Sequence, residues 1–229
     1  QDTYGHLAAR HLVALAAELK MATAEVYEVA TFYHHFDVVK ENDTAPPALT
    51  IRVCDSLSCG MAGSQALMKE LKDSLGSTVR VIPAPCVGRC ETAPVVVVGR
   101  NPVRHATAAA VQKAVREKAV ECDEPKYVNF TAYRRAGGYQ LIADCLAGKR
   151  TRDEVTKIME DSGLRGLGGA GFPVGRKWRT VAAAPEPRVM AVNIDEGEVG
   201  TFKDRWYLER DPHRFLEGML VAAWAAGVG

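Results

Sequence analysis

The sequence predicts an α/β protein with a helical lead-in followed by two α/β parts. Three observations predict this class. Hydrophobic residues recur at helical spacing within residues 1–45, strand and helix patterns alternate over residues 46–120, and a second series of elements occupies residues 151–229. Residues 121–150 form a linker with one helix between the two parts. The chain has 47% hydrophobic and 25% charged residues, which is an ordinary globular composition.

Two helices are expected in the lead-in, over residues 6–19 and 24–36. Leucines recur at helical spacing in the first of them. Thr23 is suited to cap the second helix, and the negative charge of Glu25 in the first turn interacts favourably with the positive end of the helix dipole. Two prolines within residues 41–48 then mark a linker.

The next part has the element order strand, helix, strand, strand, helix. The expected strands cover residues 48–54, 78–84 and 93–99, and the expected helices cover residues 63–75 and 105–119. Gly76 stands where the first of these helices should end. This order predicts a small α/β domain.

The last part begins with helices over residues 138–148 and 151–163. A glycine-rich stretch follows, and then an apolar segment, residues 188–193, that we expect to form a buried strand. A final helix should begin at Asp211, because an aspartate at the N-cap and Pro212 at the first helical position are both favoured there.

Four of the six cysteines form two close pairs, Cys54 with Cys59 and Cys86 with Cys90. Each pair lies in a loop just after an expected strand, so the two loops can converge on one metal centre. Structural zinc, disulfides and a [2Fe–2S] cluster are the candidate interpretations. The glycines beside the cysteines let backbone N–H groups approach cluster sulfur. The spacing alone favours a cluster and leaves zinc and unligated thiols open.

The glycine-rich stretch "SGLRGLGGAGFPVGRKW" matches the dinucleotide pattern G-x-G-x-x-G at Gly166, Gly168 and Gly171. A Rossmann fingerprint follows a strand and opens a helix, whereas these glycines follow a helix and precede Pro173. The pattern is therefore weak support for a Rossmann NAD site. Four glycines in six residues, with basic side chains and a helix expected to begin near Lys177, still suit a phosphate cradle. A flexible loop is the alternative.

A second polar cluster follows the expected strand at residues 188–193. It consists of Asn193, Asp195, Glu196 and Glu198. Ligands in open α/β sheets bind at the carboxyl ends of the strands, and these side chains offer acceptors and donors for a ribityl chain, an isoalloxazine edge or a ribose. An acidic surface turn is the alternative interpretation.

Residues 5–118 resemble a known family. The segment "EVYEVATFYHHF", the C-x4-C pair and "PCVGRCETAP" are similar to the thioredoxin-like [2Fe–2S] subunit of NADH dehydrogenases. The resemblance implies a thioredoxin-like domain whose cluster is held by Cys54, Cys59, Cys86 and Cys90.

Residues 150–229 resemble the start of the FMN- and NADH-binding subunit of the same enzymes. The motifs that carry the resemblance are "GLRGLGGAGFPVGRKW", "VNIDEGEVGTFKDR" and "DPHRFLEGM". It implies the beginning of a Rossmann-like α/β FMN-binding domain, with NAD(H) contacts from Phe172 and Glu198. The residues that it implies for FMN are Gly166, Gly168, Gly169, Lys177, Asn193, Asp195 and Glu196.

One position departs from the pattern of many relatives, because Leu167 stands where they have arginine. This variant, with "GRKW" and "DPHRFLEGM", is similar to the β subunits of soluble NAD-dependent formate dehydrogenases, in which both domains share one chain. The related domain of NAD-reducing hydrogenases tends to lack the four cysteines.

The formate dehydrogenase resemblance implies an NAD(H)-dependent flavin and iron–sulfur oxidoreductase subunit in the cytoplasm. Hydride exchange at FMN needs no catalytic side chain. The implied partners are other iron–sulfur subunits and a molybdenum or tungsten subunit that oxidises formate. We also expect the chain to continue beyond Gly229, with [4Fe–4S] cysteines in that part.

Other functions remain open from the sequence. Quinone or hydrogen could replace formate at the far end of the electron path, a carrier could lack flavin, and a zinc-stabilised nucleotide-binding protein would have no enzymatic role. The net charge of +1 does not favour nucleic acid as a partner. No apolar run approaches the ~20 residues that a membrane helix needs.

Overall fold

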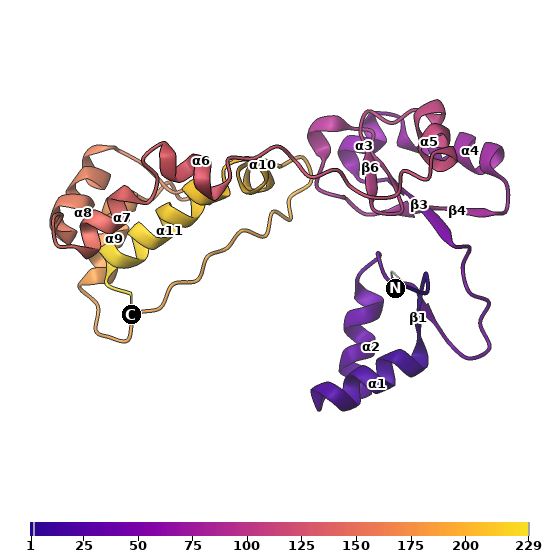
Figure 1. Ribbon diagram of the computed structural model, residues 1–229, viewed down its shortest axis with the longest axis horizontal. Coiled ribbons are helices and arrows are strands. Elements are labelled where there is room, and N and C mark those ends of the chain that lie inside the picture. The colour runs from indigo at the N-terminus through magenta and orange to yellow at the C-terminus, as the bar shows by residue number, and fades with distance from the viewer. Residues whose placement is uncertain (2, 229) are drawn as a thin grey trace. The chain divides into compact units, whose positions relative to one another are not determined.

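The computed structural model describes Gln1 and residues 3–228 (Figure 1). The chain divides into two compact units. Unit 1 contains residues up to Glu124 together with the segment Gly197–Phe202, and unit 2 contains Pro125–Glu196 and the residues from Lys203 onward. The predicted α/β class is confirmed by both sheets of unit 1 and the helices around them.

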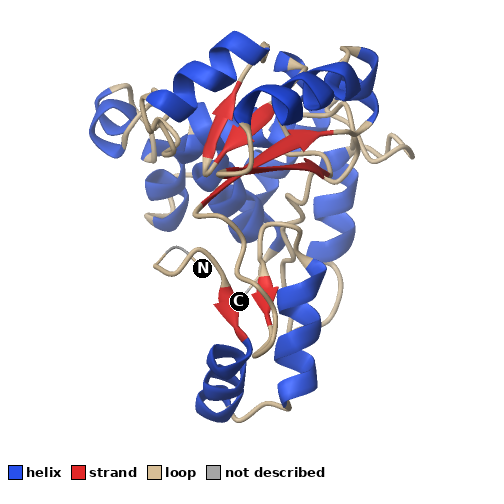
Figure 2. Cartoon of the chain, turned by 90° about the vertical axis from the view of Figure 1, so that its right-hand side faces the viewer, coloured by secondary structure: helices blue, strands red, loops and turns tan. Residues whose placement is uncertain are grey.

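Unit 1 holds all the strands of the described chain and five of its helices. The strands are β1 (Leu7–Ala8), β2 (Val38–Val39), β3 (Leu49–Cys54), β4 (Val79–Ala84), β5 (Val96–Val98) and β6 (Asn101–Val103). The helices are α1 (Ala9–Leu19), α2 (Thr23–Phe32), α3 (Leu57–Met61), α4 (Ser64–Leu75) and α5 (Ala108–Arg116), with a 3-10 turn η1 (Cys90–Thr92). Both sheets can be followed in Figure 2.

The lead-in is a pair of helices beside the short parallel pair β1–β2. Its small core is formed by Leu12 and Ala16 of α1 and by two residues of α2. The expected cap is wrong, because Thr23 is the first helical residue and the Glu25 carboxylate instead accepts a hydrogen bond from the backbone N–H of Ala22 at 2.9 Å. The helix also ends at Phe32, four residues earlier than expected, because the next residue has extended backbone.

The larger sheet has the strand order β4-β3-β5-β6. β3 and β4 are parallel and in register from Leu49 opposite Val79 to Cys54 opposite Ala84, while β5 pairs antiparallel with β3 and β6. The apolar faces of α4 and α5 complete the core. The residues of this core with no exposed surface are Ile51, Leu71, Val96, Val98 and Val111. The expected strands and helices of this part are confirmed, and β6 is an additional strand.

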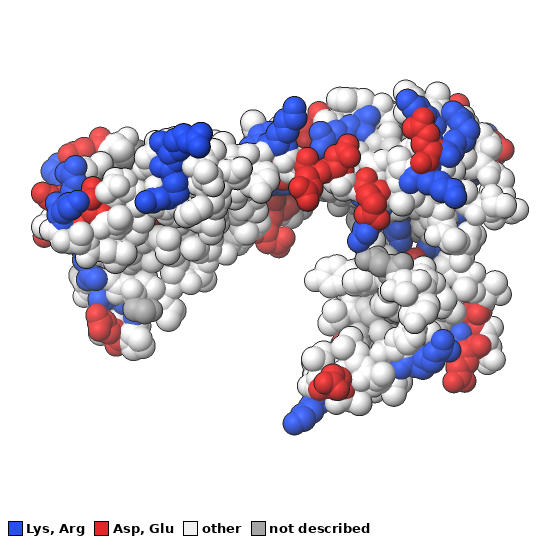
Figure 3. Space-filling view, in the orientation of Figure 1, with Lys and Arg blue, Asp and Glu red and all other residues white. Residues whose placement is uncertain are grey.

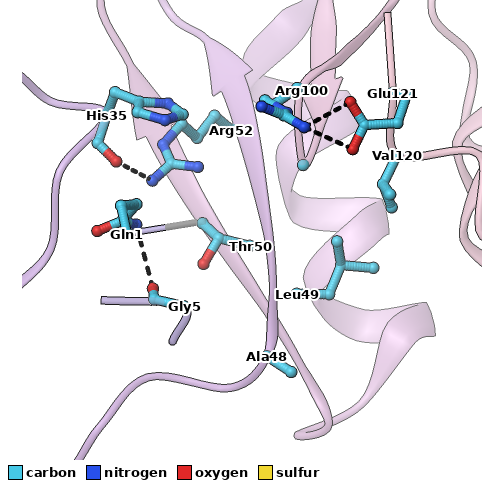
Figure 4. Close-up of a pocket in the computed structure, with 11 residues that line it drawn as sticks. Gln1, Gly5, His35, Ala48, Leu49, Thr50, Arg52, Arg100, Val120 and Glu121 are labelled. Atoms are coloured by element: carbon cyan, nitrogen blue, oxygen red, sulfur yellow. Dashed lines mark hydrogen bonds and ion pairs between the residues drawn. The ribbon is translucent and has the colours of Figure 1, made fainter. Parts of the chain in front are cut away.

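A buried arginine connects the lead-in to the larger sheet within unit 1. Arg52 of β3 donates a hydrogen bond to the backbone oxygen of His35 at 2.8 Å (Figure 4). It donates another to the Asp37 carboxylate at 3.3 Å. Arg80 of β4 contacts the same carboxylate at 2.6 Å. Burial lowers the pKa of Arg52, and the charge of Asp37 opposes this shift. A small cavity of about 190 Å³ lies beside these residues, and Gln1 and Thr50 also line it.

Unit 2 is helical in its described residues. Its helices are α6 (Phe130–Arg135), α7 (Gln140–Leu146), α8 (Arg152–Asp161), α9 (Val174–Ala182), α10 (Lys203–Arg210) and α11 (Pro212–Ala226). Its core brings together α7, α8 and α11 through Ile142, Cys145, Val155, Val221 and Ala225. None of the helices in the described part of the chain has the length and apolar character needed to cross a membrane.

Hydrogen bonds to helix ends stabilise this bundle. Thr151 and Glu154 form a reciprocal capping box at the start of α8, with distances of 3.2 and 2.7 Å. The Glu217 carboxylate of α11 accepts hydrogen bonds from the Tyr133 hydroxyl at 2.6 Å and from the backbone N–H of Tyr139, at the start of α7, at 2.8 Å. The Glu217 carboxylate therefore connects α11 to both α6 and α7 through hydrogen bonds.

Three expectations for unit 2 are wrong. The strand predicted over residues 188–193 is absent, since no described residue supplies the ladder of hydrogen bonds that a strand needs. The helix α10 begins at Lys203, within the acidic loop that the sequence predicts over residues 194–205. α9 begins at Val174, three residues before the start expected near Lys177. Gly175 in its first turn lies against α8, where a Cβ would be 2.5 Å from Cγ of Glu160. Glycine here permits two helices to pack closely.

Charged side chains are mixed on the surface. Basic and acidic residues alternate on the face shown in Figure 3, and neither sign forms a large continuous patch there. This agrees with a net charge of +1 from 29 basic and 28 acidic residues.

Candidate functional site

The four paired cysteines come together at one edge of the larger sheet of unit 1. Cys54 ends β3 and Cys59 lies in α3, while Cys86 follows β4 and Cys90 begins the turn η1. The Sγ atoms of Cys86 and Cys90 are 3.4 Å apart, and the thiols of Cys54 and Cys59 are hydrogen-bonded to each other. All six cysteines of the chain lie in its described part and carry free thiols.

The parallel pairing of β3 and β4 explains this convergence. Cys54 and Ala84 are register partners at the ends of the two strands, so both cysteine loops leave the sheet at the same edge. The backbone N–H of Asp55 donates to the oxygen of Ala84 at 3.0 Å and ties the first loop to the end of β4. Cys54 in turn donates its backbone N–H to Val95 at 3.1 Å. The loops are thus held by backbone contacts.

Backbone N–H groups point at three of the four sulfur atoms. Gly88 donates to Cys86 Sγ at 3.4 Å from a backbone φ of +69°, which favours glycine. The backbone N–H of Val95 donates to the Cys59 thiol. The N–H of Gly200 lies 3.3 Å from Cys90 Sγ. Donors of this kind stabilise the negative charge of metal-bound thiolates.

Two of the thiols, those of Cys59 and Cys86, ionise less readily than an exposed thiol. Burial, against the opposing effect of the Val95 N–H and together with the neighbouring thiols, raises the pKa of Cys59 to about 12. Burial also raises the pKa of Cys86. Because metal ligation requires the thiolate, a bound cation is the group that would compensate the buried negative charge.

The arrangement of the sulfurs fits a two-iron cluster. In a [2Fe–2S] cluster with four cysteines, each iron takes two thiolates. The structure supplies two close cysteine pairs whose charges also influence one another. Within the described residues, no three Cys, His, Asp or Glu side chains are placed to hold one metal ion. The two cysteine pairs match the two thiolates that each iron of such a cluster requires.

The glycine-rich stretch forms a closed loop in unit 2. The backbone N–H of Gly166 donates to the oxygen of Phe172 at 2.9 Å, and Val174 donates to Leu164 at 2.9 Å. The Arg165 guanidinium donates to the Gly171 oxygen at 2.9 Å and closes the base of the loop. The ends of the loop are therefore fixed between α8 and α9.

The loop forms one wall of a cavity of about 670 Å³, which lies within the size range of sites for drug-sized ligands and cofactors. Among the described residues that line it, Lys177 is the only charged side chain and Asn193 the only other polar one. Lys177 has no ion-pair partner in the described part of the chain, so its ammonium group is available to an anion. The remaining lining is glycine, alanine and apolar side chains.

The structure brings five of the predicted nucleotide-site residues together at this cavity. They are Gly166, Gly168, Phe172, Lys177 and Asn193. Gly169 and Asp195 do not line it, although Asp195 donates its backbone N–H to the Asn193 side chain at 3.0 Å.

The two glutamates expected at the nucleotide site have other positions. The Glu196 carboxylate accepts hydrogen bonds from the backbone N–H groups of Asp204 at 2.9 Å and Arg205 at 3.2 Å, at the start of α10. Glu198 belongs to the segment Gly197–Phe202 of unit 1, and its backbone oxygen accepts from Thr201.

Sequence reasoning missed the far wall of the cavity. Trp178 and Val181 of α9 and Ala222 and Ala226 of α11 line it. The two alanines stand four residues apart and so share one helix face. This spacing of small residues is the sequence feature that could have indicated the far wall of the cavity. Their small side chains leave room beside the loop.

Two parts of the chain match known families. Residues 1–119 match the family described as thioredoxin-like [2Fe–2S] ferredoxin, and residues 159–229 match the Nuo51 FMN-binding domain. An NADH-quinone oxidoreductase subunit of Rhizobium meliloti (strain 1021) is 47% identical over 106 residues, covering 46% of this chain and 25% of that protein.

Two further similarities extend over nearly the whole chain. The HoxS subunit alpha of the NAD-reducing hydrogenase of Cupriavidus necator is 30% identical over 266 residues, covering 99% of this chain and 42% of that protein. A crystal structure of an NAD+-reducing [NiFe]-hydrogenase in the air-oxidised state superposes with a TM-score of 0.69 and 25% identity, covering 96% of this chain and 42% of that chain. The chain thus spans less than half the length of these relatives.

Proposed function

Since the chain belongs to the thioredoxin-like [2Fe–2S] ferredoxin family through residues 1–119, we propose that it is a diaphorase module, which passes electrons between NAD(H) and iron–sulfur centres through FMN. One observation carries this proposal: the same chain has a centre of two cysteine pairs in unit 1 and a glycine-loop cavity of about 670 Å³ in unit 2. A zinc-stabilised nucleotide-binding protein would hold one zinc ion with the same four cysteines, and the iron and zinc content of the purified protein separates it from the diaphorase module.

Cys54, Cys59, Cys86 and Cys90 are the proposed cluster ligands. Two of them are almost fully buried, and N–H donors surround their loops. The cluster would supply one-electron transfer at a centre shielded from water. The chain's own contribution is to hold the four thiolates and to donate hydrogen bonds to them.

The cavity of unit 2 is the proposed FMN site. Gly166 and Gly168 would allow backbone to approach the cofactor, Lys177 would pair with the phosphate, and Asn193 would bind the flavin or its ribityl chain. Gly169, Asp195 and Glu196 do not line the cavity, and we assign them to shaping the loop and the start of α10.

NAD(H) would meet the flavin beside Phe172. The Phe172 ring lines the cavity and the Arg176 guanidinium lies 5.6 Å above it, so an aromatic surface and a positive charge are adjacent there. Glu198 is the second proposed NAD(H) contact. A flavin is required because NAD(H) transfers two electrons as a hydride and clusters transfer one at a time.

Formate is the proposed electron donor of the complete enzyme. The support is the Leu167 variant of the glycine loop, together with a cluster domain that keeps all four cysteines in one chain with the flavin domain. Leu167 is 87% exposed and does not line the cavity. Lys177 is the charged side chain among the described residues that line the cavity, so Lys177 would pair with the phosphate. The partners would be further iron–sulfur subunits and a molybdenum or tungsten subunit in the cytoplasm, and the complete enzyme would carry [4Fe–4S] centres.

Hydrogen is the second candidate, and it is supported by the similarity of nearly the whole chain to the HoxS subunit alpha. Purification of the native complex separates the candidates. Reduction of NAD⁺ by formate, and not by hydrogen, supports the proposal. Reduction by hydrogen alone would assign the chain to a hydrogenase, and quinone-dependent NADH oxidation alone would assign it to an NADH-quinone oxidoreductase.

A further inference from the structure

The segment Gly197–Phe202 packs with unit 1, although the residues on both sides of it belong to unit 2. The segment is a tight turn. The oxygen of Glu198 accepts hydrogen bonds from the backbone N–H of Thr201 at 3.1 Å and from its hydroxyl at 2.7 Å. These bonds fix the orientation of the peptide groups between the two residues.

Gly200 lies between those residues and faces the cysteine loops. Its backbone N–H is 3.3 Å from Cys90 Sγ, although the two residues are 110 positions apart in the chain. Gly200 has a φ of +100°, which L side chains rarely adopt. A Cβ at this position would lie 3.9 Å from the hydroxyl of Ser58, a residue of the first cysteine loop. The turn therefore contacts Cys90 and lies near Ser58 of α3.

We propose that Gly200 is a positioning residue for the cluster: its N–H donates a hydrogen bond to the Cys90 thiolate and raises the reduction potential of the [2Fe–2S] centre. The proposal rests on the cluster ligands assigned above. Reduction adds one negative charge to the cluster and its thiolates, and an N–H donor stabilises the reduced form more than the oxidised form.

The N–H donor of Gly200 comes from a different part of the chain than the N–H donors of Gly88 and Val95. Gly88 and Val95 belong to the cluster domain itself and serve Cys86 and Cys59. Gly200 belongs to the acidic segment that follows Asn193, so a residue of the flavin-domain sequence would tune the potential of the cluster.

The test is a redox titration of the cluster, followed by EPR spectroscopy, in the native complex. Gly200→Ala introduces a side chain where φ is +100° and should turn the N–H away from Cys90. Gly200→Asn is the milder variant, because asparagine tolerates positive φ better than other side chains. Gly197→Ala is the matched control, since it lies in the same turn, has no positive φ and has open space for a Cβ.

The proposal predicts a more negative cluster potential in Gly200→Ala, a smaller shift in Gly200→Asn and no shift in Gly197→Ala. Pulsed EPR of protein labelled with ¹⁵N-glycine gives a second readout, in which Gly200→Ala should lose a nitrogen coupling that Gly197→Ala keeps. Unchanged potentials and couplings in both Gly200 variants would overturn this inference alone. A wild-type complex without a [2Fe–2S] signal would instead overturn the proposed function.

Discussion

Replacing Lys177 with methionine should weaken FMN binding without unfolding the protein. The side chain keeps a similar length and apolar stem, and the ammonium group is lost. Among the described residues that line the cavity of unit 2, Lys177 carries the only charge. The phosphate of FMN would then lose its one cationic side-chain partner at this wall.

The expected magnitude follows from the contact that is lost. A hydrogen bond to a charged group contributes about 1.5–3 kcal/mol. At about 1.4 kcal/mol for each tenfold change, this corresponds to roughly 10- to 100-fold weaker binding. The glycine-loop N–H groups and the N-terminus of α9 remain, so binding should weaken and not vanish. Higher salt should weaken wild-type binding more than variant binding, because salt screens the lost charge.

The assay is the recovery of flavin fluorescence as FMN dissociates from the purified native complex. Lys157→Met is the matched control, because Lys157 lies on α8 in the same unit, is exposed and forms an ion pair with Asp161 on the surface. The control should bind FMN as the wild type does. Equal FMN affinity in Lys177→Met and in the wild type would refute the assignment of this cavity to the flavin phosphate.

Three further predictions concern the cluster, the helix packing and pH. Cys86→Ser should remove the [2Fe–2S] absorbance and EPR signal, whereas Cys122→Ser, in the exposed linker, should leave both unchanged; a cluster that survives the first change contradicts the ligand assignment. Gly175→Ala should lower the free energy of unfolding by about 1–3 kcal/mol in chemical denaturation and also weaken FMN binding, because its Cβ would lie 2.6 Å from the backbone nitrogen of Glu160 and displace α9. Burial raises the pKa of Glu217, but hydrogen bonds from a tyrosine hydroxyl and backbone N–H groups outweigh it and hold that pKa below its usual range. The stabilising contribution of the Glu217 carboxylate is therefore present above the ordinary glutamate pKa and is lost as pH falls through the lowered pKa of the folded protein. Glu217→Gln should flatten the acid limb of a curve of the free energy of unfolding against pH. An unchanged acid limb would show that this carboxylate does not stabilise the bundle.

Local signals in the sequence predicted that the two cysteine pairs converge. Two cysteine pairs after two strands could be expected to converge, and the parallel register of β3 and β4 places Cys54 opposite Ala84. The start of α11 at Pro212 and the end of α4 before Gly76 were also encoded locally. Such features depend on residues within one or two turns of each other, which a sequence shows directly.

Features that depend on distant partners could not be predicted in the same way. Residues 188–193 have the composition of a strand, but a strand forms only with a neighbour to pair with. The Glu196 carboxylate has the same chemistry whether it binds a ribose or the N–H groups at the start of α10. Gly175 and Gly200 are explained by contacts with α8 and with Cys90, and neither partner is near in sequence.

The cofactor content of the purified native complex tests the central claim most directly. We predict flavin absorbance together with a reducible [2Fe–2S] EPR signal that is lost in Cys86→Ser, and bleaching of the flavin on addition of NADH. A colourless protein that contains zinc and no iron would contradict the account.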